Sequence, residues 1–179
     1  MRPERDKAGN VESVLVTFLL TDTVSVAPML EFRAPIELNN IPGIADRIRG
    51  FRVDDSIGAV LMTREDDSVA ASGFGYNRRW RTARSVTFPV TVHYRAVVPP
   101  GRLRAGPPFD LRTFAGGVSG GGAGFLALPQ DARQYRVQIR WDLRALRRGS
   151  VGISSLGDGD ADATMGLADL QSSWFMAGP

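Results

Sequence analysis

Cysteine is absent from the 179-residue chain, and histidine occurs once, at His93. The chain therefore forms no disulfide, has no cysteine nucleophile and cannot build a structural zinc site from thiolates. A catalytic zinc site with three histidine ligands is excluded as well. Lysine is nearly absent too: Lys7 is the only lysine among the 22 basic residues, and no lysine follows a glycine-rich stretch as a P-loop requires.

The net charge is small, at +3, because 19 acidic residues offset the 22 basic ones. The arginines are spread from Arg2 to Arg148 rather than gathered in one segment. In residues 77–84 four of them surround Trp80, a combination that could contact phosphates while the indole stacks on a base. With so low a net charge we favour a strand with Trp80 inward and solvated arginines, and we expect no nucleic-acid partner.

Long hydrophobic runs are missing as well. The apolar stretch near the start, Val14 to Leu20, is far too short to span a bilayer. Basic residues precede it, as in a secretory signal, but Glu4 and Glu12 interrupt them and no small-residue cleavage site follows closely. We therefore expect a strand here, a cytoplasmic protein and no membrane partner.

Apolar and polar residues alternate over much of the chain. From Tyr135 to Trp141 every second residue is apolar, which is typical of an antiparallel strand with one face on a core. Residues 88–98 show the same period, and helix signals are confined to 42–48 and 165–171. The other strand candidates are 13–20, 24–33, 57–63, 68–72, 109–114, 123–128, 150–155 and 172–176.

These patterns predict an all-β fold. We expect a single antiparallel β-sandwich domain over residues 1–179, with at most one or two short helical turns. Residues 99–124 are rich in glycine and proline, so we expect mostly loop there, with one strand near residues 109–114.

Within that segment, Gly117–Gly121 matches G-x-S-x-G, the nucleophile motif of serine hydrolases. No helix is expected after it, and the one histidine, His93, precedes Ser119, whereas in that hydrolase fold the histidine follows the serine. We therefore interpret Gly117–Gly121 as a flexible loop and His93 as a surface or interface residue, and a hydrolase acting through Ser119 is a remote third hypothesis.

An acidic segment near the C-terminus has the spacing of a calcium loop. Asp158, Asp160, Asp162 and Asp169 fall at positions 1, 3, 5 and 12 of that pattern, and alternate oxygen ligands can wrap a hard cation. Ala163 stands where the pattern has glycine, and Asp169 stands where it has a bidentate glutamate. Calcium is a weak hypothesis here, and a solvated acidic loop is favoured.

Several segments in the second half of the chain occur in a recognisable order. In chain order they are WRT at 80–82, VTVHYR at 90–95, GFLALP at 124–129, the alternating segment from residue 135 that ends in WDL at 141–143, SSLGDG at 154–159 and SWFMAGP at 173–179. Together they resemble the N-terminal β-domain of the glycyl-aminopeptidase-type zinc metallopeptidases. The resemblance spans about residues 76–179, while residues 1–75 match only loosely.

In that family the β-domain precedes a thermolysin-like catalytic domain, whose H-E-x-x-H motif carries the zinc ligands and the general base. This chain has no H-E-x-x-H, so the resemblance transfers no catalytic residue and no zinc ligand to it. It implies a non-catalytic accessory domain that supports a catalytic domain of the same polypeptide and walls its substrate cleft. The substrates implied are peptides with small N-terminal residues, and zinc is implied only for the catalytic domain.

The end of the chain bears on this hypothesis. It stops just after an apolar, strand-like segment without a polar tail, so we expect a domain excised from a larger protein. Trp174, Phe175 and Met176 are expected to form a last strand that leads into an interdomain contact. The alternative is a stand-alone β-sandwich module that binds peptide or carbohydrate through a sheet face or the glycine-rich segment.

Overall fold

The structure is a computed structural model that describes residues 1–68, 76–99 and 109–179. Its strands are β1 Arg2–Arg5, β2 Val11–Leu20, β3 Val26–Ala27, β4 Glu31–Pro35, β5 Glu37–Leu38, β6 Ile41–Pro42, β7 Ile48–Asp55, β8 Gly58–Val60, β9 Met62–Asp66, β10 Asn77–Thr82, β11 Val86–Thr87, β12 Val90–Val97, β13 Arg112–Phe114, β14 Gly117–Gly121, β15 Leu128–Pro129, β16 Gln134–Ile139, β17 Val151–Ser154, β18 Gly157–Asp158, β19 Ala161–Gly166 and β20 Trp174–Gly178. The helical elements are the 3₁₀ turns η1 Ala45–Arg47 and η2 Gly122–Gly124 and the short helix α1 Leu167–Ser172. No helix in the described ranges is long and apolar enough to cross a membrane.

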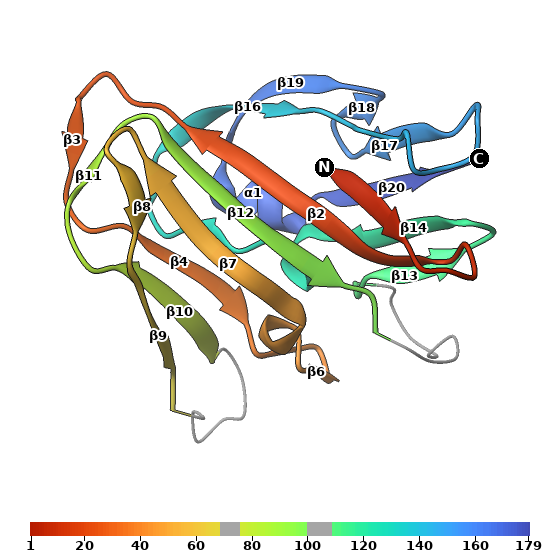
Figure 1. Cartoon of the computed structure of the whole chain (residues 1–179), viewed down its shortest axis with the longest axis horizontal. Coiled ribbons are helices and arrows are strands. Elements are labelled where there is room, and N and C mark those ends of the chain that lie inside the picture. The colour runs from red at the N-terminus through yellow and green to blue at the C-terminus, as the bar shows by residue number, and fades with distance from the viewer. Residues whose placement is uncertain (69–75, 100–108) are drawn as a thin grey trace.

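Three antiparallel sheets form two layers (Figure 1). The first sheet has the order β1-β2-β12-β7-β8 and makes one layer. The second sheet, β15-β4-β10-β9, and the third sheet, β13-β14-β20-β17-β18, lie side by side behind it and make the other. The predicted all-β class is confirmed, and α1 and the pair β16–β19 lie at the side of the third sheet.

The core lies between the layers and follows from the period of two. On β12 the alternate residues Val90, Val92 and Tyr94 are at most 1% exposed. The Phe51 ring of the first sheet stacks across the layers on Trp80 at 4.8 Å, and within its own sheet on Tyr94 at 5.6 Å. Trp80 is only 5% exposed, so the expectation that it points inward is confirmed and it offers no stacking surface for a base.

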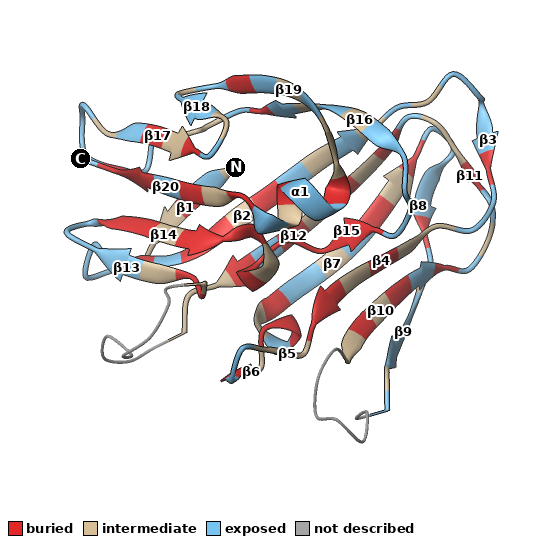
Figure 2. Ribbon diagram, turned by 180° about the vertical axis from the view of Figure 1, so that it is seen from behind, coloured by how far each residue is buried: buried red, intermediate tan, exposed pale blue. Residues whose placement is uncertain are grey.

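The glycine-rich segment is the largest departure from the sequence prediction. Gly117–Gly121 is not a flexible loop but the strand β14, which pairs with β13 and β20 inside the third sheet and is mostly buried (Figure 2). A Cβ atom at Gly117 would lie 2.4 Å from the carbonyl oxygen of Ala177, and one at Gly122 would lie 2.6 Å from that of Leu170. Glycine is needed here because neighbouring backbones approach too closely for any side chain.

Other predictions are confirmed with shifted boundaries. The helical signals at 42–48 and 165–171 correspond to η1 and α1, and the predicted strand at 24–33 is divided between β3 and β4. The strand predicted at 123–128 is wrong, because η2 extends to Gly124 and β15 starts only at Leu128. β7 was not predicted at all. In the strand predicted at 68–72, Ser68 lies outside any strand and residues 69–72 lie outside the described residues.

Candidate docking face

The last strand, β20, lies in the middle of the third sheet, between β14 and β17. Its side chains alternate between the two faces of the sheet. Phe175 and Ala177 point into the core and are 4% and 0% exposed, while Trp174 and Met176 point outward. The strand predicted for the C-terminal segment is therefore present, and its two faces have different surroundings.

The neighbours of β20 extend an apolar surface on the outward side. Met176 is paired with Ser119 on β14 and with Ile153 on β17, and the Trp174 ring lies 5.8 Å from that of Phe109. At the end of the strand, Val151 is paired with Gly178, and a Cβ on Gly178 would lie 3.5 Å from Phe114. The resulting docking face consists of Phe109, Phe114, Val151, Ile153, Trp174 and Met176.

The docking face is both solvent-accessible and poor in charge. Val151 is 52% exposed, Met176 39% and Phe114 37%. On the five strands of the third sheet the charged residues are Arg112 on β13 and Asp158 on β18, which is paired with Ile153. Large exposed apolar side chains grouped on one sheet face are typical of a surface that another polypeptide covers.

Of the expected contact residues, Trp174 and Met176 lie on the docking face and Phe175 does not. The Phe175 ring packs edge-on against Phe125, with ring centroids 5.4 Å apart, inside this domain's own core. Sequence reasoning treated the three residues as one apolar tail. It also missed Phe114 and Val151, because only the register of β13 and β17 brings them to the same face.

The acidic residues singled out for calcium lie on separate elements. Asp158 ends β18, Asp160 lies in the following turn, Asp162 is on β19 and Asp169 is in α1. The Oδ1 atom of Asp160 accepts a hydrogen bond from the Trp141 backbone N–H at 3.0 Å. Nothing in the described ranges forms a group of three or more histidine, aspartate or glutamate side chains able to hold a metal ion.

Asp162 is also occupied by an ion pair. Arg136 Nη2 donates to its Oδ2 at 2.7 Å and Gln138 Nε2 donates to the same oxygen at 2.8 Å. The hydrogen bond from Arg136 is the main cause that lowers the pKa of Asp162 to about 2. The geometry therefore brings no three of these four acids together as ligands.

Ser119 and His93 are likewise far apart in the fold. Ser119 faces outward on the third sheet, beside Met176, whereas His93 faces outward on the first sheet. The Nδ1 atom of His93 lies 2.9 Å from Oγ1 of Thr17, and this contact holds the ring over β2 and β12. The two residues lie on opposite outer faces of the sandwich, so they form no nucleophile–base pair.

A cleft of about 330 Å³ opens beside the docking face, lined in part by Val151 and Ile153. Trp141, Asp158 and Asp160 also line the cleft. The Trp141 ring lies directly over Gly152, where a Cβ atom would be 2.5 Å from the ring carbons. The sequence predicted Trp141 only as the end of a strand, and it held no signal for this cleft.

No protein-family model matches the chain, and no curated protein matches it. Among solved structures, the fold resembles part of an aminopeptidase N family protein from Idiomarina loihiensis, with a TM-score of 0.65 and 14% sequence identity. The match covers 99% of this chain and 28% of the Idiomarina loihiensis chain. At this identity the likeness shows the fold alone, and this chain corresponds to little more than a quarter of its structural relative.

Proposed function

We propose that this chain is the non-catalytic N-terminal β-domain of a glycyl-aminopeptidase-like zinc peptidase, where it supports the catalytic domain and walls one side of its substrate cleft. The observation that carries the proposal is the match of nearly the whole chain to one part of a longer aminopeptidase N family protein. The ordered sequence segments of residues 76–179 support the same family.

The docking face supports a role beside a second domain. Burying an exposed side chain such as Val151 or Met176 contributes roughly 1–2 kcal/mol, because about 25 cal/mol is gained per Å² of apolar surface removed from water. A partner that covers the whole face therefore gains several such contributions and has only Arg112 and Asp158 as charged residues of the sheet to desolvate. We assign this contact to the catalytic domain.

Zinc belongs to the catalytic domain in this proposal. The described part of the chain offers no group of ligands that fits the metal. No step of peptide hydrolysis is therefore assigned to any residue of this domain, and its contribution is to hold and shape the neighbouring domain.

A second candidate function is that of a stand-alone module for peptide or carbohydrate. The cleft beside Trp141 favours it, since an indole face and the carboxylates of Asp158 and Asp160 are groups that bind sugar C–H faces and hydroxyls, or peptide N–H groups. Binding of an oligosaccharide or a neutral peptide to the isolated chain, lost on Trp141→Ala, would favour this function over the first.

The first test is to read the source gene beyond Pro179. An open frame that continues into H-E-x-x-H with a downstream glutamate is the expected result, and the longer protein should bind zinc and release small N-terminal residues from peptides. A frame that ends at Pro179, or continues without a metal-binding motif, contradicts the proposal.

A variant then tests the docking face itself. Met176→Glu should leave the melting temperature of the isolated chain nearly unchanged, because the side chain is exposed there, and should lower peptidase activity of the longer protein. Leu61→Glu is the matched control, since Leu61 is 76% exposed and lies outside the third sheet. Equal effects of the two variants in the longer protein would contradict the assigned contact.

A further inference from the structure

The outer face of the first sheet carries a group of arginines beside His93, on the side of the molecule away from the docking face. Arg95 on β12 is directly opposite Arg49 on β7, and the neighbouring outward pair is His93 with Arg52. Like charges directly opposite each other in an antiparallel pair destabilise a sheet. The pairing of Arg49 with Arg95 therefore does not itself stabilise the sheet.

A bulge in β7 places the two β7 arginines on the same face. Arg49 and Arg52 are three residues apart, so a regular strand would send their side chains to opposite faces. The register shifts between the partners of His93 and Arg95, and Gly50 has a φ of +62°, a left-handed conformation that favours glycine. The extra residue brings both guanidinium groups outward, next to each other.

The acids on this face leave part of the charge unbalanced. Arg95 forms an ion pair with Glu4 on β1: its Nε donates to Glu4 Oε2 at 2.5 Å. This hydrogen bond is the main cause that lowers the pKa of Glu4 to about 2. Arg52 lies 3.9 Å from Asp54, with their side chains 70% and 42% exposed, so that contact is weak. Arg49 makes no ion pair with any described residue.

We propose that Arg49, Arg52 and His93 form a docking site for an acidic polypeptide segment. Guanidinium groups bind carboxylates through paired N–H donors, and outward residues along a strand are about 7 Å apart, the same spacing as alternate carboxylates of an extended segment. The outward positions of β2, β7 and β12 carry no Phe, Tyr or Trp on which a nucleic-acid base could stack. An extended acidic chain therefore fits this face better than a nucleic acid.

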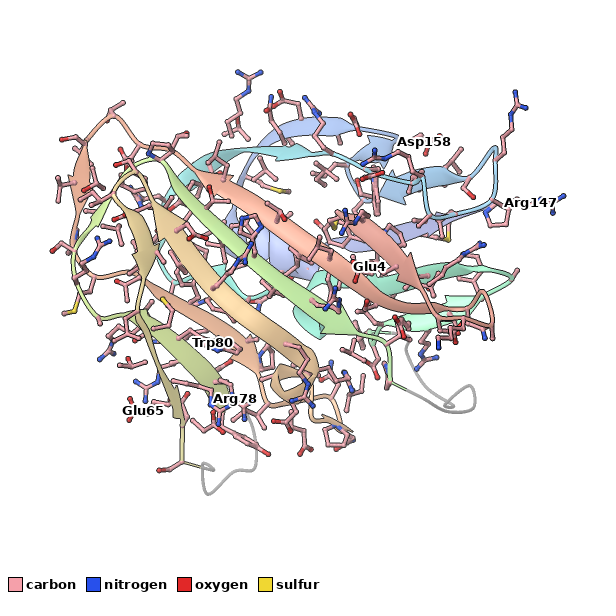
Figure 3. All side chains as sticks on the ribbon, viewed as in Figure 1. Glu4, Glu65, Arg78, Trp80, Arg147 and Asp158 are labelled. Carbon is pink, nitrogen blue, oxygen red and sulfur yellow. The ribbon has the colours of Figure 1, made fainter. Side chains whose placement is uncertain are left out.

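The test uses a fluorescent octaglutamate peptide and the 179-residue chain. The double variant Arg49→Ser/Arg52→Ser should weaken binding by about tenfold or more, since both bidentate donors are lost. Arg147→Ser/Arg148→Ser is the matched control: it removes the same charge from an exposed turn at the other end of the molecule, where Figure 3 labels Arg147. This control should change the affinity by less than about twofold.

Two further comparisons make the proposal falsifiable. Arg49→Lys/Arg52→Lys should bind with intermediate affinity, because lysine keeps the charge and loses the paired donors. Melting curves check the fold, and the serine variant should melt no lower than wild type, since it removes the opposed charges. Absence of octaglutamate binding at low salt, equal losses in the serine and control variants, or tighter binding of a thymidine oligonucleotide would each overturn the proposal.

Discussion

The carboxylate of Asp55, at the end of β7, is the most heavily hydrogen-bonded acid of the first sheet. Its side chain is 0% exposed. The two oxygens accept from Arg84 Nη1 and Nη2 at 2.6 and 3.1 Å and from the backbone N–H groups of Thr87, Ile57 and Gly58 at 3.0, 3.0 and 3.1 Å. One side chain thus joins the β7–β8 turn to β11.

Replacing Asp55 by alanine should destabilise the protein by about 3–5 kcal/mol. Three backbone N–H donors then lose their acceptor, each at a cost of about 1–3 kcal/mol, and water reaching the turn recovers part of that cost. Asp55→Asn keeps one acceptor oxygen and should lose roughly half as much. Since a domain of this kind is stable by about 5–15 kcal/mol, the alanine variant is close to the limit of folding.

The pH dependence provides a second readout. The Arg84 guanidinium, together with the backbone donors, lowers the pKa of Asp55 below its ordinary value of 3.8. A lowered folded-state pKa means that this stabilisation is complete above the unfolded-state value and is lost as the pH falls below it. Wild-type stability should therefore decline below about pH 4, and the decline should be shallower in Asp55→Asn.

The assay is urea unfolding followed by tryptophan fluorescence, at neutral pH and at several pH values below 4. Asp54→Asn is the control, because the neighbouring carboxylate is 42% exposed and should change the free energy of unfolding by less than about 0.5 kcal/mol. An Asp55→Ala variant within about 1 kcal/mol of wild type would refute the reasoning, because the buried donors would then have found other partners.

Three further outcomes are expected. Tyr94→Phe should cost about 1–3 kcal/mol in thermal unfolding, since the buried Ala127 N–H donates to the Tyr94 hydroxyl at 3.0 Å and would lose its acceptor; an unchanged melting temperature would contradict this. Gly122→Ala should cost about 1–3 kcal/mol because of the close approach of the Leu170 carbonyl, and a stabilised variant would show that the backbone moves freely there. Millimolar calcium should leave the melting temperature unchanged, since Asp162 is already ion-paired, and a clear rise would restore the calcium hypothesis.

Strands with one buried face could be predicted from the sequence alone. The alternation from Tyr135 to Trp141 identified β16, and that of residues 88–98 identified β12, because side chains on a half-buried strand must differ between its two faces. The last strand at the C-terminus, where β20 lies, was predicted from an apolar run and not from alternation.

Strands whose pattern depends on tertiary contacts could not be predicted. In β7 the bulge at Gly50 breaks the period of two, so the outward residues Arg49 and Arg52 are three positions apart. In β14 the glycines resemble a flexible loop, and only the close approach of β20 explains them. Of the residues on the outward face of β20 and its neighbours, Trp174 and Met176 were singled out from the sequence, while Phe114 and Val151 required the register of the folded sheet.

The most direct test of the account is the accessibility of Met176 in the longer protein that we propose this chain belongs to. Because the chain has no cysteine, Met176→Cys introduces one thiol whose maleimide labelling rate can be compared between the isolated chain and the longer protein, with any other cysteines replaced. We expect the rate to fall by about tenfold or more in the longer protein, while Leu61→Cys is labelled equally in both. Equal labelling of residue 176 in the two proteins would contradict the claim that this face docks a second domain.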